Sequence, residues 1–354
     1  MSVCLAIKSL RPYQGGKPIS ELRRELELEH IIKLASNENP LGIGPRVQKA
    51  IQKAITEVSR YPDNNGFELK QAISEHLNVD TNCITLGNGS NNILELVARI
   101  YVCDADDEVV FSEYAFMVYS LVTQALGAKA VVTKSKNFGH DLDAMLVAIS
   151  DKTKLIFIAN PNNPTGTLLS DESIHQFLKK VSKSAVVVLD QAYFEYLNVE
   201  DRMIVWLKEF DNLIITRTFS KAYALAGLRV GYSVSSAKIA DYLNRIRQPF
   251  NVNHIAQTAA ISALADDSFL TKSVLANKNG LIQLSKGLDE LKLSYIKSFA
   301  NFIALKVDNA TDTYQKLLIK GFIVRPVEMG NYLRVSVGTL KENNDFLKAL
   351  KSIL

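Results

Sequence analysis

The stretch TFSKAYALAGLRVGY, residues 218–232, decides both the fold and the chemistry expected of this chain. It begins inside an apolar run typical of a strand, and it places Lys221 directly after that run and Arg229 eight residues later. Small and apolar neighbours favour a partly desolvated lysine, and desolvation makes the neutral amine available as a nucleophile toward a carbonyl. Arg229 offers a planar fork for a phosphate, and Thr218 and Ser220 add hydroxyl donors.

Outward from this stretch, short apolar runs alternate with helical patterns from about residue 80 to residue 235. The predicted strands are 83–87, 108–112, 154–160, 185–190 and 212–219, and the predicted helices are 90–101, 119–127 and 170–183. Ser170 is the predicted N-cap of the third helix, because two acidic residues follow it in the first turn. Near-continuous β-branched runs predict strands buried on both faces, hence a mostly parallel α/β sheet covered by helices.

The chain has 354 residues, which exceeds the size at which one hydrophobic core usually stops growing. We therefore expect a large domain over 36–248 and a smaller C-terminal domain over 249–354. The segment 1–35 is predicted to form an N-terminal arm and part of the small domain. Strand-like patterns at 302–307 and 332–338 lie among helices and make the small domain α+β.

Composition excludes several classes of function. Lys and Arg number 41 against 37 Asp and Glu, and the excess is spread along the chain, so we expect no nucleic-acid partner. No apolar run reaches the roughly 18 residues of a membrane helix, so we expect no membrane association. The N-terminus lacks a basic leader, and the three cysteines show no metal-ligand spacing. These features predict a cytoplasmic protein.

A second motif, GNGSNN at 87–92, is a glycine-containing turn that opens a predicted helix. Free backbone N–H groups and the helix dipole make such a turn an anion cradle, with Gly89, Ser90 and Asn91 nearest the anion. By itself the motif is weak, since turns of this composition are common before helices.

Two more motifs follow predicted strands. In NPNNPTG (160–166) the prolines and glycine force the chain out of the sheet, and Asn163 is placed to offer its amide to a ligand oxygen. In DQAY a carboxylate, Asp190, closes a very apolar strand, and Tyr193 follows. A buried carboxylate is costly unless it is paired, so Asp190 is expected to face a cation.

Together these motifs provide a lysine nucleophile, a phosphate cradle and a buried carboxylate, which is the set that pyridoxal 5′-phosphate requires. We predict that Lys221 binds the cofactor covalently and that Asp190 holds its ring nitrogen protonated. An aromatic residue should stack on the ring, with Tyr114 preferred and Phe116 as the alternative. The predicted cofactor contacts in this chain are Gly89, Ser90, Asn91, Tyr114, Asn163, Asp190, Tyr193, Thr218, Ser220, Lys221 and Arg229.

The sequence resembles the fold-type-I pyridoxal-phosphate enzymes of the class I/II aminotransferase group, and more narrowly the histidinol-phosphate aminotransferase family. The resemblance spans nearly the whole chain, in the family's order. The matching stretches are LRPYQGGKP (10–18), KLASNENPLG (33–42), RYPDNNG (60–66), LGNGS (86–90), NPNNPTG (160–166), SKAYALAGLRVGY (220–232), PFNVN (249–253), IVRP (323–326) and LRVSVGT (333–339).

The resemblance implies a substrate pocket formed by Tyr13, Asn163 and Arg334, with Arg325 helping to bind the substrate's phosphate. It also implies an obligate homodimer with shared active sites, in which Tyr61 reaches the cofactor phosphate of the other subunit. One departure concerns the connection VEMGNY (327–332), which is shorter than the loop expected of the family.

The implied function is transamination of L-histidinol phosphate with 2-oxoglutarate, in histidine biosynthesis, with Lys221, Asp190 and Tyr193 as catalytic residues. An aromatic amino-acid aminotransferase is the main alternative, because an imidazole and a phenyl ring can share an apolar pocket. An amino-acid-phosphate decarboxylase and a non-catalytic ligand sensor on the same fold come next. A metal hydrolase is disfavoured, since the five histidines are scattered without ligand spacing.

Overall fold

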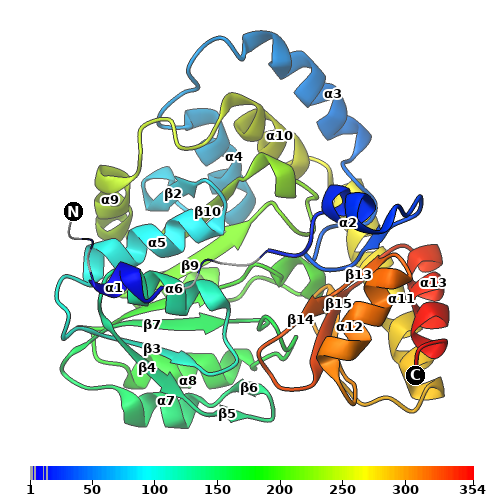
Figure 1. Ribbon diagram of the computed structural model, residues 1–354. Helices are drawn as coiled ribbons and strands as arrows, with labels where there is room; N and C mark the ends of the chain where they lie inside the picture. The colour runs from blue at the N-terminus through cyan, green and yellow to red at the C-terminus, as the bar shows by residue number, and fades with distance from the viewer. Residues whose placement is uncertain (1–2, 4, 11, 13–14) are drawn as a thin grey trace.

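A seven-stranded sheet lies at the centre of the larger part of the molecule (Figure 1). The structure, a computed structural model, describes residues 3, 5–10, 12 and 15–354. In spatial order the strands are β2 (Ile84–Gly87), β10 (Gly231–Ser235), β9 (Leu213–Thr218), β8 (Val186–Asp190), β7 (Thr153–Ala159), β3 (Glu108–Ser112) and β4 (Lys129–Thr133). Strand β10 is antiparallel to both of its neighbours, and all other adjacent pairs are parallel.

Strand β8 shows why this sheet is covered on both faces. Its side chains alternate between two hydrophobic clusters: Val186 and Val188 belong to one, Val187 and Leu189 to the other. Successive side chains of a strand point to opposite faces, so a continuous apolar run requires a layer of helices on each side. The helices are α1 (Leu5–Lys8), α2 (Ile19–Leu26), α3 (Pro45–Ala54), α4 (Phe67–Leu77), α5 (Ser90–Tyr101), α6 (Met117–Ala125), α7 (Leu142–Ala148), α8 (Asp171–Lys180), α9 (Ala237–Ile246), α10 (His254–Leu264), α11 (Asp267–Glu290), α12 (Ala310–Ile319) and α13 (Leu340–Lys351).

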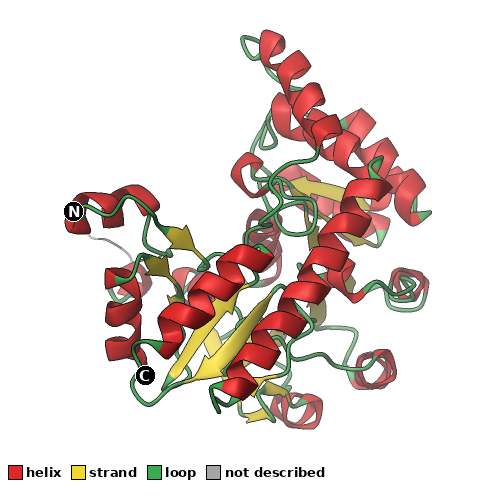
Figure 2. Cartoon of the chain, turned by 90° about the vertical axis from the view of Figure 1, so that its right-hand side faces the viewer, coloured by secondary structure: helices red, strands yellow, loops and turns green. Residues whose placement is uncertain are grey.

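The smaller sheet has the order β11-β12-β15-β14 and is antiparallel throughout. Its strands are β11 (Tyr295–Ile296), β12 (Phe302–Lys306), β15 (Tyr332–Ser336) and β14 (Arg325–Pro326). Leu333 and Val335 of β15 face a cluster with side chains of α11, α12 and α13, and Figure 2 shows helices lying across this sheet. Arg334 and Ser336 alternate with them and so point to the opposite face, toward the larger sheet.

The N-terminal part of the chain joins this smaller unit. Strand β1 (Ile32–Lys33) pairs in parallel with β13 (Phe322–Ile323), and Leu22 of α2 packs in a cluster with Ile323. Two-stranded pairing of β5 (Ser135–Lys136) with β6 (Gly139–His140) completes the strands of the described residues.

The predicted fold class, a mostly parallel α/β sheet with a second α+β unit, is confirmed. Helix α8 starts after Ser170, whose hydroxyl accepts the Ser173 N–H at 3.2 Å, as a serine N-cap does. Two strands of the large sheet were not predicted: β10, whose run GYSVS is too polar to stand out, and the edge strand β4, which is largely exposed.

The domain boundary predicted at residue 248 falls before α10. That helix contributes Ala256, Ala260 and Leu264 to the hydrophobic cluster of the larger sheet. We therefore propose that the large domain extends through Leu264 and that the small domain begins with α11.

Candidate active site

Twelve of the residues predicted to bind cofactor or substrate line one cavity of about 1430 Å³. The cavity lies where β2, β7, β8 and β9 end, at the edge of the large sheet that faces the smaller one. Strands that run in one direction present their carboxyl ends at the same edge, where α/β proteins bind ligands. The twelve residues are Ser90, Asn91, Tyr114, Asn163, Asp190, Tyr193, Thr218, Ser220, Lys221, Arg229, Arg325 and Arg334.

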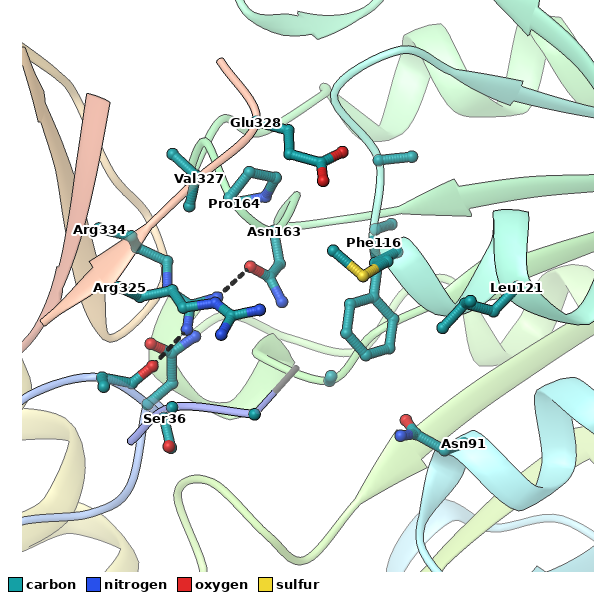
Figure 3. A pocket seen from close by; sticks show the side chains of 18 of the residues that line it. Ser36, Asn91, Phe116, Leu121, Asn163, Pro164, Arg325, Val327, Glu328 and Arg334 are labelled. Carbon is teal, nitrogen blue, oxygen red and sulfur yellow. Dashed lines mark hydrogen bonds between the residues drawn. The ribbon is translucent and has the colours of Figure 1, made fainter. Parts of the chain in front are cut away.

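An anion cradle forms one end of the cavity. Helix α5 begins at Ser90, after Gly89 with φ 76°, and Asn91 lies on the cavity floor (Figure 3). A Cβ on Gly89 would lie 2.6 Å from Arg229 Nη2, so only glycine lets the guanidinium approach this turn. Arg229 Nη1 also donates to Ser220 Oγ at 3.3 Å. The helix N-terminus and a guanidinium therefore converge on one point, as a phosphate requires.

The lysine stands next to this cradle. Lys221 Nζ donates to the backbone carbonyl oxygen of Ser36 at 3.1 Å and lies 5.9 Å from the centre of the Tyr193 ring. Burial lowers the pKa of Lys221 to about 7, helped by the positive charges of Arg334 and Arg229. A substantial fraction of the amine is thus neutral at neutral pH, which is the form that attacks a carbonyl.

Both oxygens of the Asp190 carboxylate accept hydrogen bonds from side chains that do not line the cavity. Asp190 is 4% exposed; its Oδ2 accepts from the Tyr119 hydroxyl at 2.9 Å and its Oδ1 from Thr216 Oγ1 at 3.1 Å. Burial raises the pKa of Asp190, and these two hydrogen bonds and the charge of Lys221 oppose that rise. A cation in the cavity would complete the environment that favours the ionised form.

Two asparagines connect this region to the small domain. Asn37 donates its amide N–H to the Tyr193 hydroxyl at 2.9 Å, and Arg334 Nη1 donates to Asn163 Oδ1 at 2.6 Å. Arg334 Nη2 also donates to the carbonyl oxygen of Ala35 at 2.7 Å. Figure 3 shows the Arg334 contacts at the cavity wall.

The two predicted substrate arginines lie side by side on adjacent strands. Arg325 of β14 and Arg334 of β15 are direct register partners in an antiparallel pair. Residues directly opposite each other in such a pair project from the same face, so both guanidinium groups line the cavity. They provide a site for an anion with several acceptor oxygens.

The two candidate stacking residues occupy different places. The Phe116 ring points into the cavity (Figure 3) and lies edge-on to Tyr119, at 5.8 Å between ring centres. The Tyr114 ring stacks instead on Phe138, at 6.2 Å between ring centres.

The remaining predicted residues lie elsewhere. Gly89 precedes Ser90 in the anion cradle and does not itself line the cavity. Tyr61 is 83% exposed and stacks on Phe250 at 4.6 Å, away from the cavity of its own chain. Tyr13 lies outside the described residues.

Sequence reasoning missed several residues of this site. Ser36 and Asn37 lie in the stretch KLASNENPLG, which signalled a resemblance without suggesting a role. Tyr119 was assigned to a helix and never to the Asp190 carboxylate, because no local pattern predicts a contact over 71 positions. Glu328 and Met329 line the cavity from the short connection after β14, where no motif marks them.

Comparison with known proteins places the chain in a family. The model of the aminotransferase class I and II family matches residues 29–350. The chain belongs to that family. It is 52% identical to histidinol-phosphate aminotransferase 1 of Idiomarina loihiensis, with 98% of this chain and 96% of the relative covered. It is 53% identical to histidinol-phosphate aminotransferase of Methylobacillus flagellatus, with the same coverage of both chains.

A solved structure agrees. Histidinol-phosphate aminotransferase from Sinorhizobium meliloti, in complex with pyridoxal-5′-phosphate, superposes with a TM-score of 0.91 at 27% identity. The match covers 99% of this chain and 98% of that one. The predicted family, the enzyme class of pyridoxal-phosphate-dependent aminotransferase and the predicted cofactor are confirmed. Within the described residues no helix is both long and apolar enough to span a membrane.

Proposed function

We propose that this aminotransferase converts L-histidinol phosphate and 2-oxoglutarate into imidazole acetol phosphate and glutamate, in histidine biosynthesis. The observation that carries the substrate is the register pairing of Arg325 with Arg334 at the cavity wall. A plain amino acid offers one carboxylate, for which one arginine suffices. A phosphomonoester dianion accepts several charge-assisted hydrogen bonds and so uses both. The names of the relatives at 52–53% identity support this choice.

The cavity fits pyridoxal phosphate. Because residue 89 is a glycine, the Arg229 guanidinium can approach the start of α5, and the two together form the anion cradle. The buried Asp190 carboxylate faces the same cavity. When bound, the cofactor supplies an electron sink for the carbon that loses its proton. We assign its phosphate to Ser90, Asn91, Thr218, Ser220 and Arg229, its ring nitrogen to Asp190, and its ring hydroxyl oxygen to Asn163 and Tyr193.

Lys221 is the residue that moves the proton. Its amine, with a pKa lowered to about 7, can take a proton from the substrate carbon that bears the amino group. The Ser36 carbonyl accepts from Nζ and holds the amine in the cavity. Because the same amine is the attachment point for the cofactor, it must be released before it can act as a base.

We propose Phe116 rather than Tyr114 as the residue that stacks on the cofactor ring. The Phe116 ring touches Tyr119, which itself binds Asp190, so Phe116 lies over the region assigned to the ring nitrogen. The Tyr114 ring is stacked on Phe138 and has no contact of this kind with Tyr119.

We further propose that the enzyme is a cytoplasmic homodimer in which Tyr61 of one subunit reaches the cofactor phosphate of the other. Exposed apolar side chains recur along one stretch of the chain, namely Ile55, Val58, Tyr61 and Phe67, and Phe250 stacks on Tyr61. Side chains of this kind gather at subunit interfaces. The free thiols Cys83 and Cys103 suit a reducing compartment.

A panel of amino donors tests the substrate. Histidinol phosphate, phenylalanine, tyrosine and histidine are compared as donors to 2-oxoglutarate by kcat/KM. We expect histidinol phosphate to exceed the others by about 100-fold, the value of two charge-assisted contacts. The apolar wall of Phe116, Leu121 and Met329 favours an aromatic amino-acid aminotransferase as second candidate. Faster turnover of phenylalanine would establish that alternative.

A further inference from the structure

A tyrosine below the cavity floor engages the carboxylate assigned to the cofactor ring. Tyr119 of α6 is 0% exposed, and its hydroxyl donates to Asp190 Oδ2 at 2.9 Å. Tyr119 does not line the cavity itself, and its hydroxyl meets the site through Asp190.

The position of this hydroxyl is fixed by packing. The Tyr119 ring stacks on Phe157 of β7, with 4.5 Å between ring centres and 3° between planes. Phe116 meets its edge at 5.8 Å, and Phe111 lies at 6.5 Å. A ring enclosed by three aromatic neighbours cannot swing away, so its hydroxyl stays directed at the carboxylate.

The hydrogen bond acts on the charge of Asp190. The carboxylate accepts from Tyr119 at one oxygen and from Thr216 at the other, and the Ala192 backbone N–H donates to it as well, so its plane is fixed. Donation to a carboxylate stabilises its ionised form. Burial raises the pKa of Tyr119 well above its usual range, so the phenol stays a neutral donor at working pH. The other titratable groups that face this pair are Lys221 and Tyr193.

We propose that Tyr119 is a positioning residue whose hydroxyl holds Asp190 ionised and aimed at the cofactor's ring nitrogen, and thereby keeps that nitrogen protonated. The proposal rests on the assignment of Asp190 to the ring nitrogen made above. Tyr119→Phe removes one oxygen and keeps the ring that packs on Phe157. Without the donor, the Asp190 carboxylate becomes more basic, so the proton that it shares with the ring nitrogen moves toward the carboxylate and the nitrogen is less protonated.

The test uses holoenzyme reconstituted with pyridoxal phosphate that carries ¹⁵N at the ring nitrogen. The ¹⁵N chemical shift, followed against pH, reports protonation of that nitrogen without turnover. In Tyr119→Phe we expect the chemical shift to lie closer to that of the neutral nitrogen, because a lost hydrogen bond to a charged group changes the distribution of the shared proton by about tenfold or more. For the same reason kcat should fall about 10- to 100-fold, with KM within about threefold.

Tyr232→Phe is the matched control. Tyr232 is a buried tyrosine of β10, 3% exposed, whose hydroxyl meets the charged Arg217 outside the cavity. Its loss should leave the ¹⁵N titration unchanged. Should Tyr119→Phe fold poorly, 3-fluorotyrosine at position 119 supplies a more acidic phenol in the same packing and should move the ¹⁵N chemical shift toward that of the protonated nitrogen.

The outcomes separate this proposal from the function it rests on. If Asp190→Ala changes the ¹⁵N titration while Tyr119→Phe and the fluorotyrosine protein match the wild type, Tyr119 is a packing residue and the proposal is wrong. If Asp190→Ala also leaves the titration unchanged, the assignment of Asp190 is wrong, and the Tyr119 role falls with it.

Discussion

The pairing of Arg325 with Arg334 allows a sharp test of substrate choice. Arg334 is a poor residue to remove, because it also binds Asn163 and the Ala35 carbonyl, and its loss would disturb the cofactor side of the cavity. Arg325 lies on the strand β14, and its replacement leaves those contacts in place. Arg325→Ala is therefore the cleaner perturbation.

The magnitude follows from the number and setting of the lost contacts. A hydrogen bond to a charged group is worth about 1.5–3 kcal/mol, and a guanidinium fork can supply two. Arg325 is half-buried, so solvent screening reduces the sum. We expect a loss of about 2–3 kcal/mol toward histidinol phosphate, which corresponds to a 30- to 150-fold fall in kcat/KM. Phenylalanine has no phosphate, and its kcat/KM should fall about threefold or less.

The assay compares both donors with 2-oxoglutarate by glutamate formation. Arg325→Lys keeps the charge without the fork, and its loss should be intermediate, about 10-fold. Arg245→Ala, which removes an exposed arginine from α9, controls for net charge and should change neither donor. An equal loss for the two donors in Arg325→Ala would refute the reasoning, since a contact to phosphate cannot affect a substrate that lacks one.

Three further predictions follow from the same geometry. Lys221→Ala should still bind pyridoxal phosphate through Arg229 and the α5 turn, but borohydride should no longer fix the cofactor to the protein; fixation detected by mass spectrometry in this variant would show that another amine carries it. In cofactor-free wild-type protein, the rate of covalent cofactor attachment should rise with pH through about 7 and then level off, because the Lys221 amine, whose pKa is lowered to about 7, must lose its proton to react; a rate that keeps rising toward pH 10 would indicate an ordinary lysine. Mixing Lys221→Ala protein with Tyr61→Ala protein should restore part of the activity, since the heterodimer has one site with neither defect; verified subunit exchange without recovery would place Tyr61 in its own subunit's site.

Local sequence predicted the parts of the cavity that follow strands. The motifs around Gly89, Asn163, Asp190 and Lys221 each break a buried strand, and the parallel sheet carries all four to one edge. The geometry was therefore implied once the strands were recognised. The antiparallel β10 was hidden, because its polar run GYSVS lacks the β-branched pattern of its neighbours.

Contacts between distant segments could not be predicted in this way. The Phe116 ring meets Tyr119 and the Tyr114 ring meets Phe138, although the two positions differ by only two residues after the same strand. Phe138, the ring that Tyr114 meets, lies in another segment of the chain. Likewise, the contacts of Ser36 with Lys221 and of Asn37 with Tyr193 form only in the folded chain, because 185 and 156 positions separate the partners.

The connection after β14 brings two side chains into the cavity without interrupting the arginine pair. Gly330, at φ 71°, closes the turn, and the Arg325–Arg334 register holds on both sides of it. Glu328 and Met329 therefore enter the cavity on a loop whose length leaves the two arginines in place. The groups assigned to the cofactor lie on the large sheet and its flanking turns, which this loop does not support. A change in the loop would therefore alter the part of the wall that carries Glu328 and Met329 and leave the arginine pair in place.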